Sequence, residues 1–224
     1  MGRAIGDLLP LAIGVALSPV PIVAVILILG TPKAGSNGPA FALGWVGGLA
    51  VVSVVVVLLA SGADDPDSGS STTVDVLELV LGALFVVLAL GQWHKRPQAG
   101  QPAQLPGWMQ TLDGFTPAKS LALGAALSAV KPKNLALTVA AAGSIAQAGT
   151  DTGGTAVSIV VFVAIGSITV AGPVLCNTVA RERAARPLAS IKEFMSQHNA
   201  VIMMVVLLVL GGKLLGNGIA GLSD

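Results

Sequence analysis

The chain has 224 residues, of which 54% are hydrophobic and only 10% are charged, and its formal net charge is +1. Soluble domains carry about a quarter of charged residues, so this composition excludes an ordinary soluble domain. The near-neutral charge also gives no reason to expect a nucleic-acid partner.

Long apolar runs separated by short polar interruptions make up most of the sequence. A transmembrane helix needs about 20 mostly apolar residues to cross about 30 Å of hydrocarbon. The candidate stretches are 8–29, 40–61, 74–93, 121–145, 156–180 and 201–215, the last of which is short for a span. We therefore predict an all-α integral membrane protein with six transmembrane helices. A cleaved signal peptide at the start is not expected, because Asp7 and two prolines interrupt that pattern.

Basic residues are concentrated in alternate connections between these stretches. The first, third and fifth connections contain Lys33, then Lys95, Arg96 and Lys119, then Arg181, Arg183, Arg186 and Lys192. The second connection, 61–75, is acidic and has no basic residue. Because basic loops face the cytoplasm, we predict a multi-pass protein of the bacterial plasma membrane with both termini outside. A missed or additional span would reverse part of this topology.

A repeat relates the two halves of the chain. Residues 11–20 read LAIGVALSPV and residues 121–130 read LALGAALSAV, so seven of ten positions are identical. Each copy opens a group of three spans, and an odd number of spans makes the second group enter the membrane from the opposite side. We predict two inverted three-helix repeats, 1–93 and 118–224, joined by a basic cytoplasmic connection at 94–117.

Prolines predict that the first helix of each repeat is broken. Proline removes a backbone donor, and freed polar groups in a bilayer must face protein or a water-filled cavity. Inverted-repeat transporters place their substrate site at such breaks. We therefore predict a substrate site between the repeats, formed by Ser18, Pro19, Pro21, Ser128, Lys131, Pro132, Lys133 and Asn134. A simple proline kink is the alternative for the first break.

The second break indicates the charge of the substrate. A lysine near the bilayer centre costs at least about 2.5–3.5 kcal/mol, which makes Lys131 and Lys133 functional candidates. Alternatively, the fourth span begins near Asn134 and both lysines reach an interface. Lysine, Asn and exposed helix amides suit a phosphate, sulfate or carboxylate, whereas a hard cation would need oxygen ligands. In the repeat alignment Lys131 faces Pro21, so one half supplies positive charge and the other supplies backbone.

Asp113 precedes the fourth span and is a candidate for gating or coupling. It could pair with a lysine of the second break or relay protons, or it could simply stabilise the start of the following helix. The sequence shows neither a hydrolase constellation nor an ATP-binding motif, so we expect no enzyme activity, no metal and no cofactor. Cys176 is expected to be a packing residue.

Four stretches of the chain resemble the actinobacterial peptidoglycolipid-addressing (GAP) or sulfolipid-addressing proteins, within the wider lysine-exporter superfamily. They are the run 11–49, with its S-P-x-P motif; the stretch 106–137, with Trp108, Asp113, Thr116, Pro117 and the triplet Pro132, Lys133, Asn134; and the later runs 166–188 and 198–218. Lys131 departs from the pattern, where Asn is expected more often. The resemblance implies a role in the export of cell-envelope glycolipids, with a larger lipid transporter as a possible partner, and two three-helix repeats.

Three functions are therefore open. The first is a carrier or flippase for an anionic lipid or glycolipid. The second is an exporter of an amino acid or organic anion, and the third is a non-transporting accessory subunit of a lipid-export complex. The expected partners are membrane lipids and the anionic substrate, and a homodimer is plausible for so small a bundle.

Overall fold

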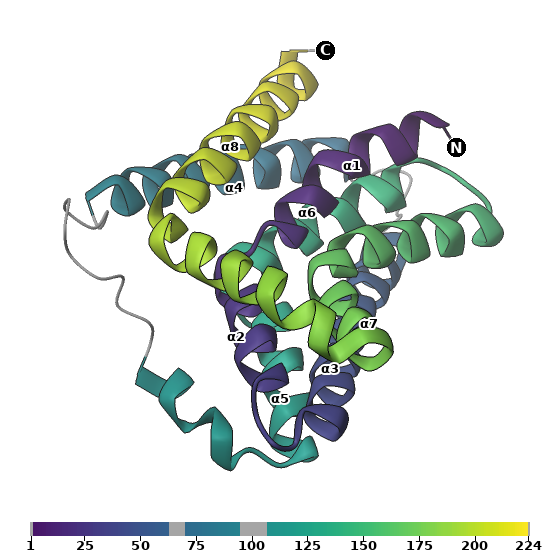
Figure 1. The fold of residues 1–224 in the computed structure, drawn as a ribbon. Helices are drawn as coiled ribbons and strands as arrows, with labels where there is room; N and C mark the ends of the chain where they lie inside the picture. Colours follow the sequence, from purple (N-terminus) through teal and green to yellow (C-terminus); the bar gives the residue numbers. More distant parts are fainter. Residues whose placement is uncertain (1, 63–69, 95–106, 224) are drawn as a thin grey trace.

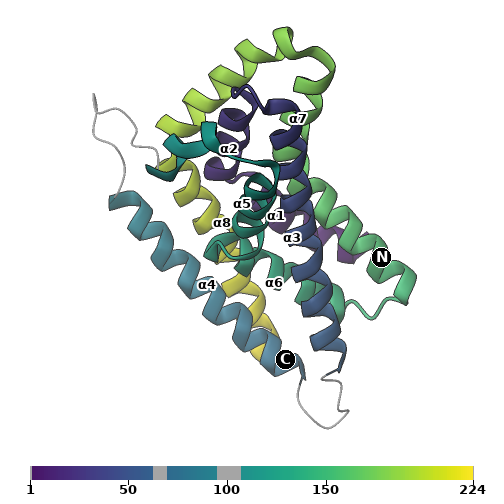
Figure 2. The same cartoon turned by 90° about the horizontal axis from the view of Figure 1, so that it is seen from below.

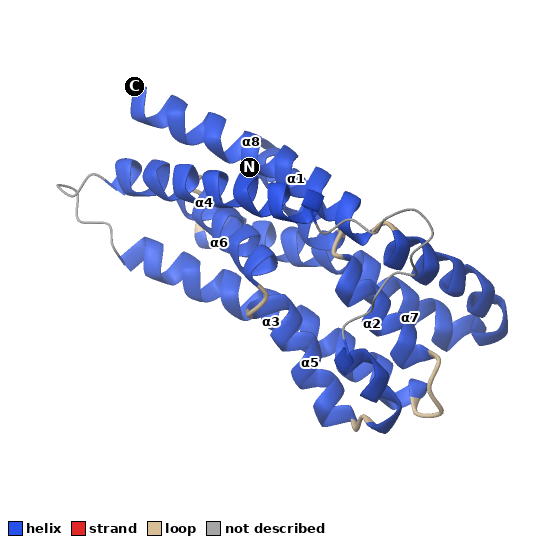
Figure 3. Cartoon of the chain, turned by 90° about the vertical axis from the view of Figure 1, so that its left-hand side faces the viewer, coloured by secondary structure: helices blue, strands red, loops and turns tan. Residues whose placement is uncertain are grey.

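The computed structural model describes residues 2–62, 70–94 and 107–223, and the chain is helical in nearly all of them (Figure 1). The elements are α1 (Gly2–Ala16), α2 (Pro19–Leu29), α3 (Ala34–Gly62), α4 (Ser70–His94), the 3₁₀ helix η1 (Gly107–Gly114), α5 (Pro117–Ala129), α6 (Pro132–Gln147), α7 (Thr152–Gln197) and α8 (Asn199–Ser223). Figure 3 shows the described residues as helices joined by short loops, which agrees with the prediction of an all-α protein.

Both predicted proline breaks are present. The first stretch divides at Leu17 and Ser18 into α1 and α2, with a bend of 46° between Leu8–Ala16 and Pro19–Leu29. The second divides at Val130 and Lys131 into α5 and α6. In both cases a proline occupies the first turn of the new helix, where its missing N–H leaves no intrahelical bond unmade.

Small residues bring α3 and α5 into close contact (Figure 2). A Cβ added to Gly44 would collide with the Leu121 carbonyl, and one added to Gly124 would collide with the Phe41 carbonyl. Ser120, Gly124 and Ser128 form the buried face of α5 at a spacing of four residues. This is the small-xxx-small packing that membrane helices use, because lipid supplies no hydrophobic force between them.

The helices of the two halves contact one another in corresponding pairs. α5 packs on α3, and α1 packs on α7; likewise α6 packs on α3, and α2 packs on α7. α4 packs along α8, as Figure 2 shows, through Gly82, Gly211 and Gly218. Nearly every helix therefore has its main partner in the other half of the chain.

α7 is a bent helix rather than a span followed by a loop. Its apolar arm, Thr152–Ala180, ends at a non-helical residue, Ala180, with φ −146° and ψ 59°. The basic stretch expected to form the fifth connection continues beyond this bend as a second helical arm, residues 181–197. Cys176, expected to be a packing residue, is exposed on the first arm, so that expectation was wrong.

Three described helices are long and apolar enough to cross a membrane: Ala34–Ala60, Thr152–Ala180 and Asn199–Leu222. The bent pair α1–α2 makes a fourth if it is counted as one span. The apolar part of α4, Glu78–His94, is shorter, and α5 and α6 have 13 and 16 residues. The chain is therefore a multi-pass membrane protein, whereas the predicted count of six spans stays a prediction.

Part of the predicted topology lies outside the described residues. The acidic core of the second connection, 63–69, and the basic pair Lys95 and Arg96 belong to this part. The predicted connection 94–117 contains η1, which lies against α2.

Candidate functional site

The two helix breaks lie against each other, because α1 packs along α6. An α-helix leaves its last four carbonyl groups and its first four N–H groups without intrahelical partners. At each break one helix ends and another begins, so both kinds of group occur there. The hydrogen bonds around them show how the two breaks are joined.

Lys133 of α6 caps the C-terminal end of α1. Its side chain is 4% exposed, and its Nζ donates to the Gly14 carbonyl at 2.7 Å and, more weakly, to the Leu17 carbonyl at 3.4 Å. The C-terminal end of a helix carries a partial negative charge, which favours a cation at this position. The alternative in which Lys133 reaches out to an interface does not hold, because its ammonium group is directed at backbone inside the protein.

Asn134 joins the breaks a second time. It is fully buried, accepts a hydrogen bond from Ser18 Oγ at 2.8 Å and donates one through Nδ2 to the Leu127 carbonyl at 2.9 Å. Ser18 stands at the N-cap of α2 but makes no capping bond there, since its hydroxyl is used on Asn134. We name the group Ser18, Lys133 and Asn134, with the carbonyls of Gly14 and Leu17, the inter-break latch.

The prolines make the first break rich in acceptors. Pro19 and Pro21 occupy two of the first three positions of α2 and have no N–H, so two of the usual unpaired donors are missing. The carbonyls of α1 keep their need for donors, and side chains from the second half supply them. Besides Lys133, Thr169 of α7 donates to the Ala16 carbonyl at 2.7 Å.

The other predicted site residues lie around the latch without joining it. Ser128 is buried, donates to the Ala125 carbonyl at 3.0 Å and faces Gly48 of α3. Pro132 is exposed, and Lys131 is half-buried; its backbone bonds Ala126 and Leu135, but its side chain makes no hydrogen bond or ion pair with the residues that the structure describes. Lys131 is thus the one lysine of the break whose ammonium group is not already held by backbone carbonyls.

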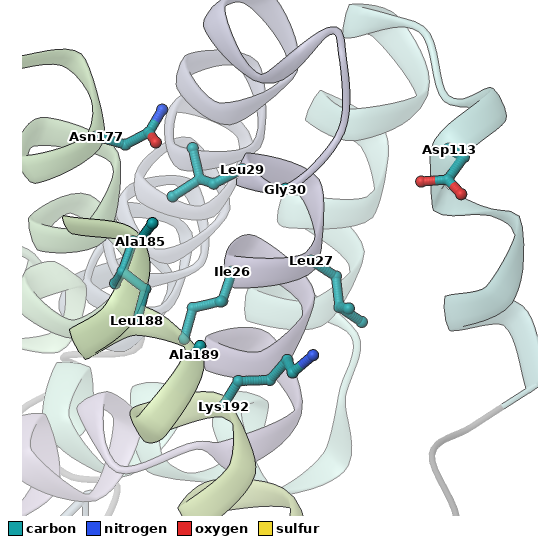
Figure 4. Close-up of a pocket in the computed structure, with 10 residues that line it drawn as sticks. All are labelled: Ile26, Leu27, Leu29, Gly30, Asp113, Asn177, Ala185, Leu188, Ala189 and Lys192. Carbon is teal, nitrogen blue, oxygen red and sulfur yellow. The ribbon is translucent and has the colours of Figure 1, made fainter. Parts of the chain in front are cut away.

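Asp113 lies elsewhere, on η1, in an exposed position. It lines a cleft of about 460 Å³ between α2, η1 and the second arm of α7, which we name the α2–α7 cleft. Figure 4 shows the side chains of Asp113 and Lys192 extending toward α2 from η1 and from α7, with Asn177 at another wall. The helix that follows Asp113 is capped by Thr116, whose hydroxyl accepts from the Lys119 N–H, so Asp113 is not the capping residue.

A second hollow of about 680 Å³ lies at the bend of α7, and we name it the α7 groove. Both arms of α7 line it, and its walls are apolar apart from Arg183 and Cys176. Leu188 lines both the groove and the α2–α7 cleft.

Sequence reasoning missed several of these residues. Thr169, Asn177 and Lys192 stand on α7, outside any proline motif or repeat match. Trp45 is also fully buried and donates to the Gly166 carbonyl at 3.3 Å. The usable signal was that polar residues are rare in the apolar stretches, and Thr169 is one of them.

Comparison with known proteins assigns the chain to a family. The profile described as "Sap, sulfolipid-1-addressing protein" matches residues 8–220, which is almost the whole chain. No curated protein and no solved structure matches it. Both helix breaks, the inter-break latch and both hollows lie within the matched residues. The chain therefore belongs to the family of sulfolipid-1-addressing proteins.

Proposed function

We propose that this protein is a membrane transporter that exports an anionic cell-envelope lipid or glycolipid, and that it acts without enzyme chemistry. Its family links it to lipid- or glycolipid-related membrane processes. The observation that carries the proposal is the inter-break latch, in which a buried lysine of one half holds the open helix end of the other. A buried intramembrane lysine is costly, and such residues commonly mark substrate pathways.

The proposed architecture has six spans in two inverted repeats. The first repeat consists of α1–α2, α3 and α4, and the second of α5–α6, α7 and α8. Corresponding contacts support it, since α1 packs on α7 as α5 packs on α3, and α4 packs on α8. In this arrangement both termini lie outside and the basic connections lie in the cytoplasm of a bacterial cell.

The proposed mechanism is an exchange of partners at the latch. Lys131, whose side chain makes no bond to the described residues, first meets the anionic headgroup. Lys133 then leaves the Gly14 and Leu17 carbonyls for the same anion, and the Ser18–Asn134 bond opens. Release of α1 from α6 lets the two repeats rock against each other, as alternating access requires.

Two other functions stay open. A small-solute exporter would use the same latch for an amino acid or organic anion. An accessory subunit of a larger lipid transporter would use the latch only to hold its own fold together. A gradient or a partner protein would supply the energy for either kind of transport, and a homodimer stays a prediction.

The first experiment deletes the gene and compares the lipids at the cell surface with the lipids retained inside, together with cytosolic metabolites. Loss of an anionic glycolipid from the surface, with accumulation inside, supports the proposal. Unchanged lipids with an accumulated amino acid or organic anion favour the small-solute exporter.

Complementation of the deletion separates a transporter from a scaffold. Lys131→Ala and Lys133→Ala variants that reach the membrane should both fail to restore export. If the double variant is folded, is inserted and restores export, the anion-site mechanism is wrong and the accessory role is favoured.

A further inference from the structure

We infer that the α7 groove and the α2–α7 cleft form one binding site for a glycolipid, with an acyl chain in the groove and the anionic headgroup in the cleft. For the class of ligand this inference rests on the proposed function. It adds a place of binding outside the helix breaks, where the latch is closed in this structure.

The groove has the size and lining that an acyl chain needs. Its volume of about 680 Å³ falls within the range of about 300–1,000 Å³ that is typical of ligand sites. Gly172, Pro173 and Val179 line it from the first arm of α7, and Pro187 and Ile191 line it from the second. Because its walls are almost entirely apolar, the groove has no means of binding a free sugar or an amino acid.

The cleft has the groups that an acidic sugar headgroup needs. Lys192 supplies a cation for a sulfate, sulfonate or phosphate, and Asn177 and Asp113 supply acceptors for sugar hydroxyls. On the second arm of α7, the exposed Arg183, which lines the groove, and the exposed Arg186 add positive charge, and the exposed Glu193 adds negative charge. With Lys192 and Asp113 of the cleft, three basic side chains stand against two acidic ones, and this small excess of positive charge favours an anionic lipid over a zwitterionic one.

The second arm of α7 is the wall that the two hollows share. Ala184 lines the groove and Ala185 lines the cleft, while Leu188, which is 8% exposed, contacts both. An apolar hollow and a polar hollow on either side of one helix fit the two ends of a single amphiphile. Two unrelated ligands would not require this shared wall.

Cys176 allows the binding of a ligand in the groove to be measured directly. It is the single cysteine of the chain, it is exposed, and it lines the groove. The experiment places the wild-type protein in phosphatidylcholine nanodiscs and measures the rate at which a lipid-soluble maleimide alkylates this thiol. Sulfoquinovosyl diacylglycerol, an anionic glycolipid, is then included in the nanodiscs. At about ten times its dissociation constant, mass action predicts alkylation about tenfold slower.

Two variants and two matched controls locate the ligand. Lys192→Gln should lose most of the protection, whereas Lys119→Gln, on α5 outside both hollows, should keep it. Gly172→Leu adds a side chain to the lining of the groove at a position where a Cβ meets nothing within 4 Å, so it should occupy the space of the acyl chain. Because Gly172 lies one turn from Cys176, this variant is read by the lipid retained in native mass spectrometry, with the exposed Gly91→Leu as control.

Each outcome decides the inference. Protection by the glycolipid but not by soluble sulfoquinovose, lost in Lys192→Gln, supports it. An alkylation rate that is the same with and without the glycolipid in the phosphatidylcholine nanodiscs, or full protection in Lys192→Gln, overturns it. Export is measured separately in the deletion strain. If the glycolipid protects Cys176 of the wild-type protein but the deletion strain has normal surface lipids, the binding site is supported and the transport function is rejected. If the deletion abolishes export but the glycolipid does not protect Cys176, this binding site is rejected and the proposed transport function stands.

Discussion

The two helix breaks share a sequence pattern but use opposite chemistry. The first, between α1 and α2, contains two prolines and presents backbone carbonyls that need donors. The second, between α5 and α6, contains one proline and presents two polar side chains, Lys133 and Asn134, that reach across to the first. The first break is therefore held by the second half of the chain, while the second break caps its own Leu127 carbonyl through Asn134.

This difference explains how the hydrogen-bonding groups of the two breaks can satisfy each other. If both breaks offered carbonyls, they would repel each other and leave acceptors unpaired in the bilayer, where each unpaired group costs several kcal/mol. If both offered lysines, like charges would face each other. With donors on one side and acceptors on the other, the closed contact is satisfied, and under the proposed mechanism a bound anion takes over the donors when it opens.

The strongest way to break this complementarity is Lys133→Met. It leaves the Gly14 and Leu17 carbonyls without their donor, and each buried acceptor left unpaired costs about 1–3 kcal/mol. We expect a clear loss of thermal stability in detergent and no export in the complemented deletion strain. Lys131→Met, which removes no bond to the described residues, should keep the stability of the wild type and lose only export.

Lys133→Arg is the control for charge at this position. It keeps donors for the carbonyls of α1, so it should recover part of the lost stability. If Lys133→Met and Lys131→Met have equal stability, the capping role assigned to Lys133 is wrong.

The next largest loss of stability is expected when glycine is replaced by alanine between α3 and α5, and the comparison is the same change between α1 and α7. Gly124→Ala drives a Cβ into the Phe41 carbonyl and to 2.9 Å from the Trp45 nitrogen, both of which are backbone and cannot move alone. Overpacking of this kind costs about 1–3 kcal/mol. Gly166→Ala meets only side chains, Val15 Cγ1 at 3.3 Å and Leu49 Cδ1 at 3.5 Å.

Gly166→Ala should therefore be near neutral, because alanine also removes the helix penalty of glycine, about 0.5–1 kcal/mol. Thermal unfolding of the two single variants in the same detergent tests the contrast. Equal losses would mean that α1 and α7 approach as closely as α3 and α5.

A smaller effect is expected at the Ser18–Asn134 hydrogen bond. A double-mutant cycle with Ser18→Ala and Asn134→Leu should give a coupling energy of about 0.5–1.5 kcal/mol, as for a buried neutral hydrogen bond. Thermal unfolding of the four proteins provides the numbers. A coupling energy of zero would mean that the two side chains do not bond in the membrane, and that Lys133 alone closes the latch.

The sequence predicted the breaks because their signals are local. The repeat of residues 11–20 at 121–130 located both, and the prolines that follow predicted where each helix starts again. The alignment of Lys131 with Pro21 also predicted that one half supplies charge and the other backbone, although the lysine that reaches the backbone is Lys133.

The other features of the site could not be predicted from the local sequence, because they depend on which helices pack together. Asp113 was assigned to coupling from its place in the chain, but the folding of η1 onto α2 brings it to a cleft with Lys192, about 80 residues away along the sequence. The bend at Ala180 has no proline or glycine at that position, so the basic stretch was expected to be a loop. Both hollows depend on that bend and were therefore not foreseen.

The smallest change in stability, with a large change in function, is expected for Pro19→Ala with Pro21→Ala. These prolines stand at the start of α2, where their missing N–H groups break no existing bond, so the folded state loses little. Alanine restores two donors, which can bond the carbonyls of Val15 and Leu17 and continue α1 into α2. The Leu17 carbonyl would then be satisfied within the helix rather than by Lys133.

Spin labels on α1 and α2 of a Cys176→Ala background should report a bend smaller than the present 46°, and export should fall. A matched control, Pro39→Ala, changes a proline inside α3 that takes no part in the latch. If the double variant straightens and still exports at the wild-type rate, the break at α1–α2 serves packing alone, and movement between the repeats must begin at α5–α6.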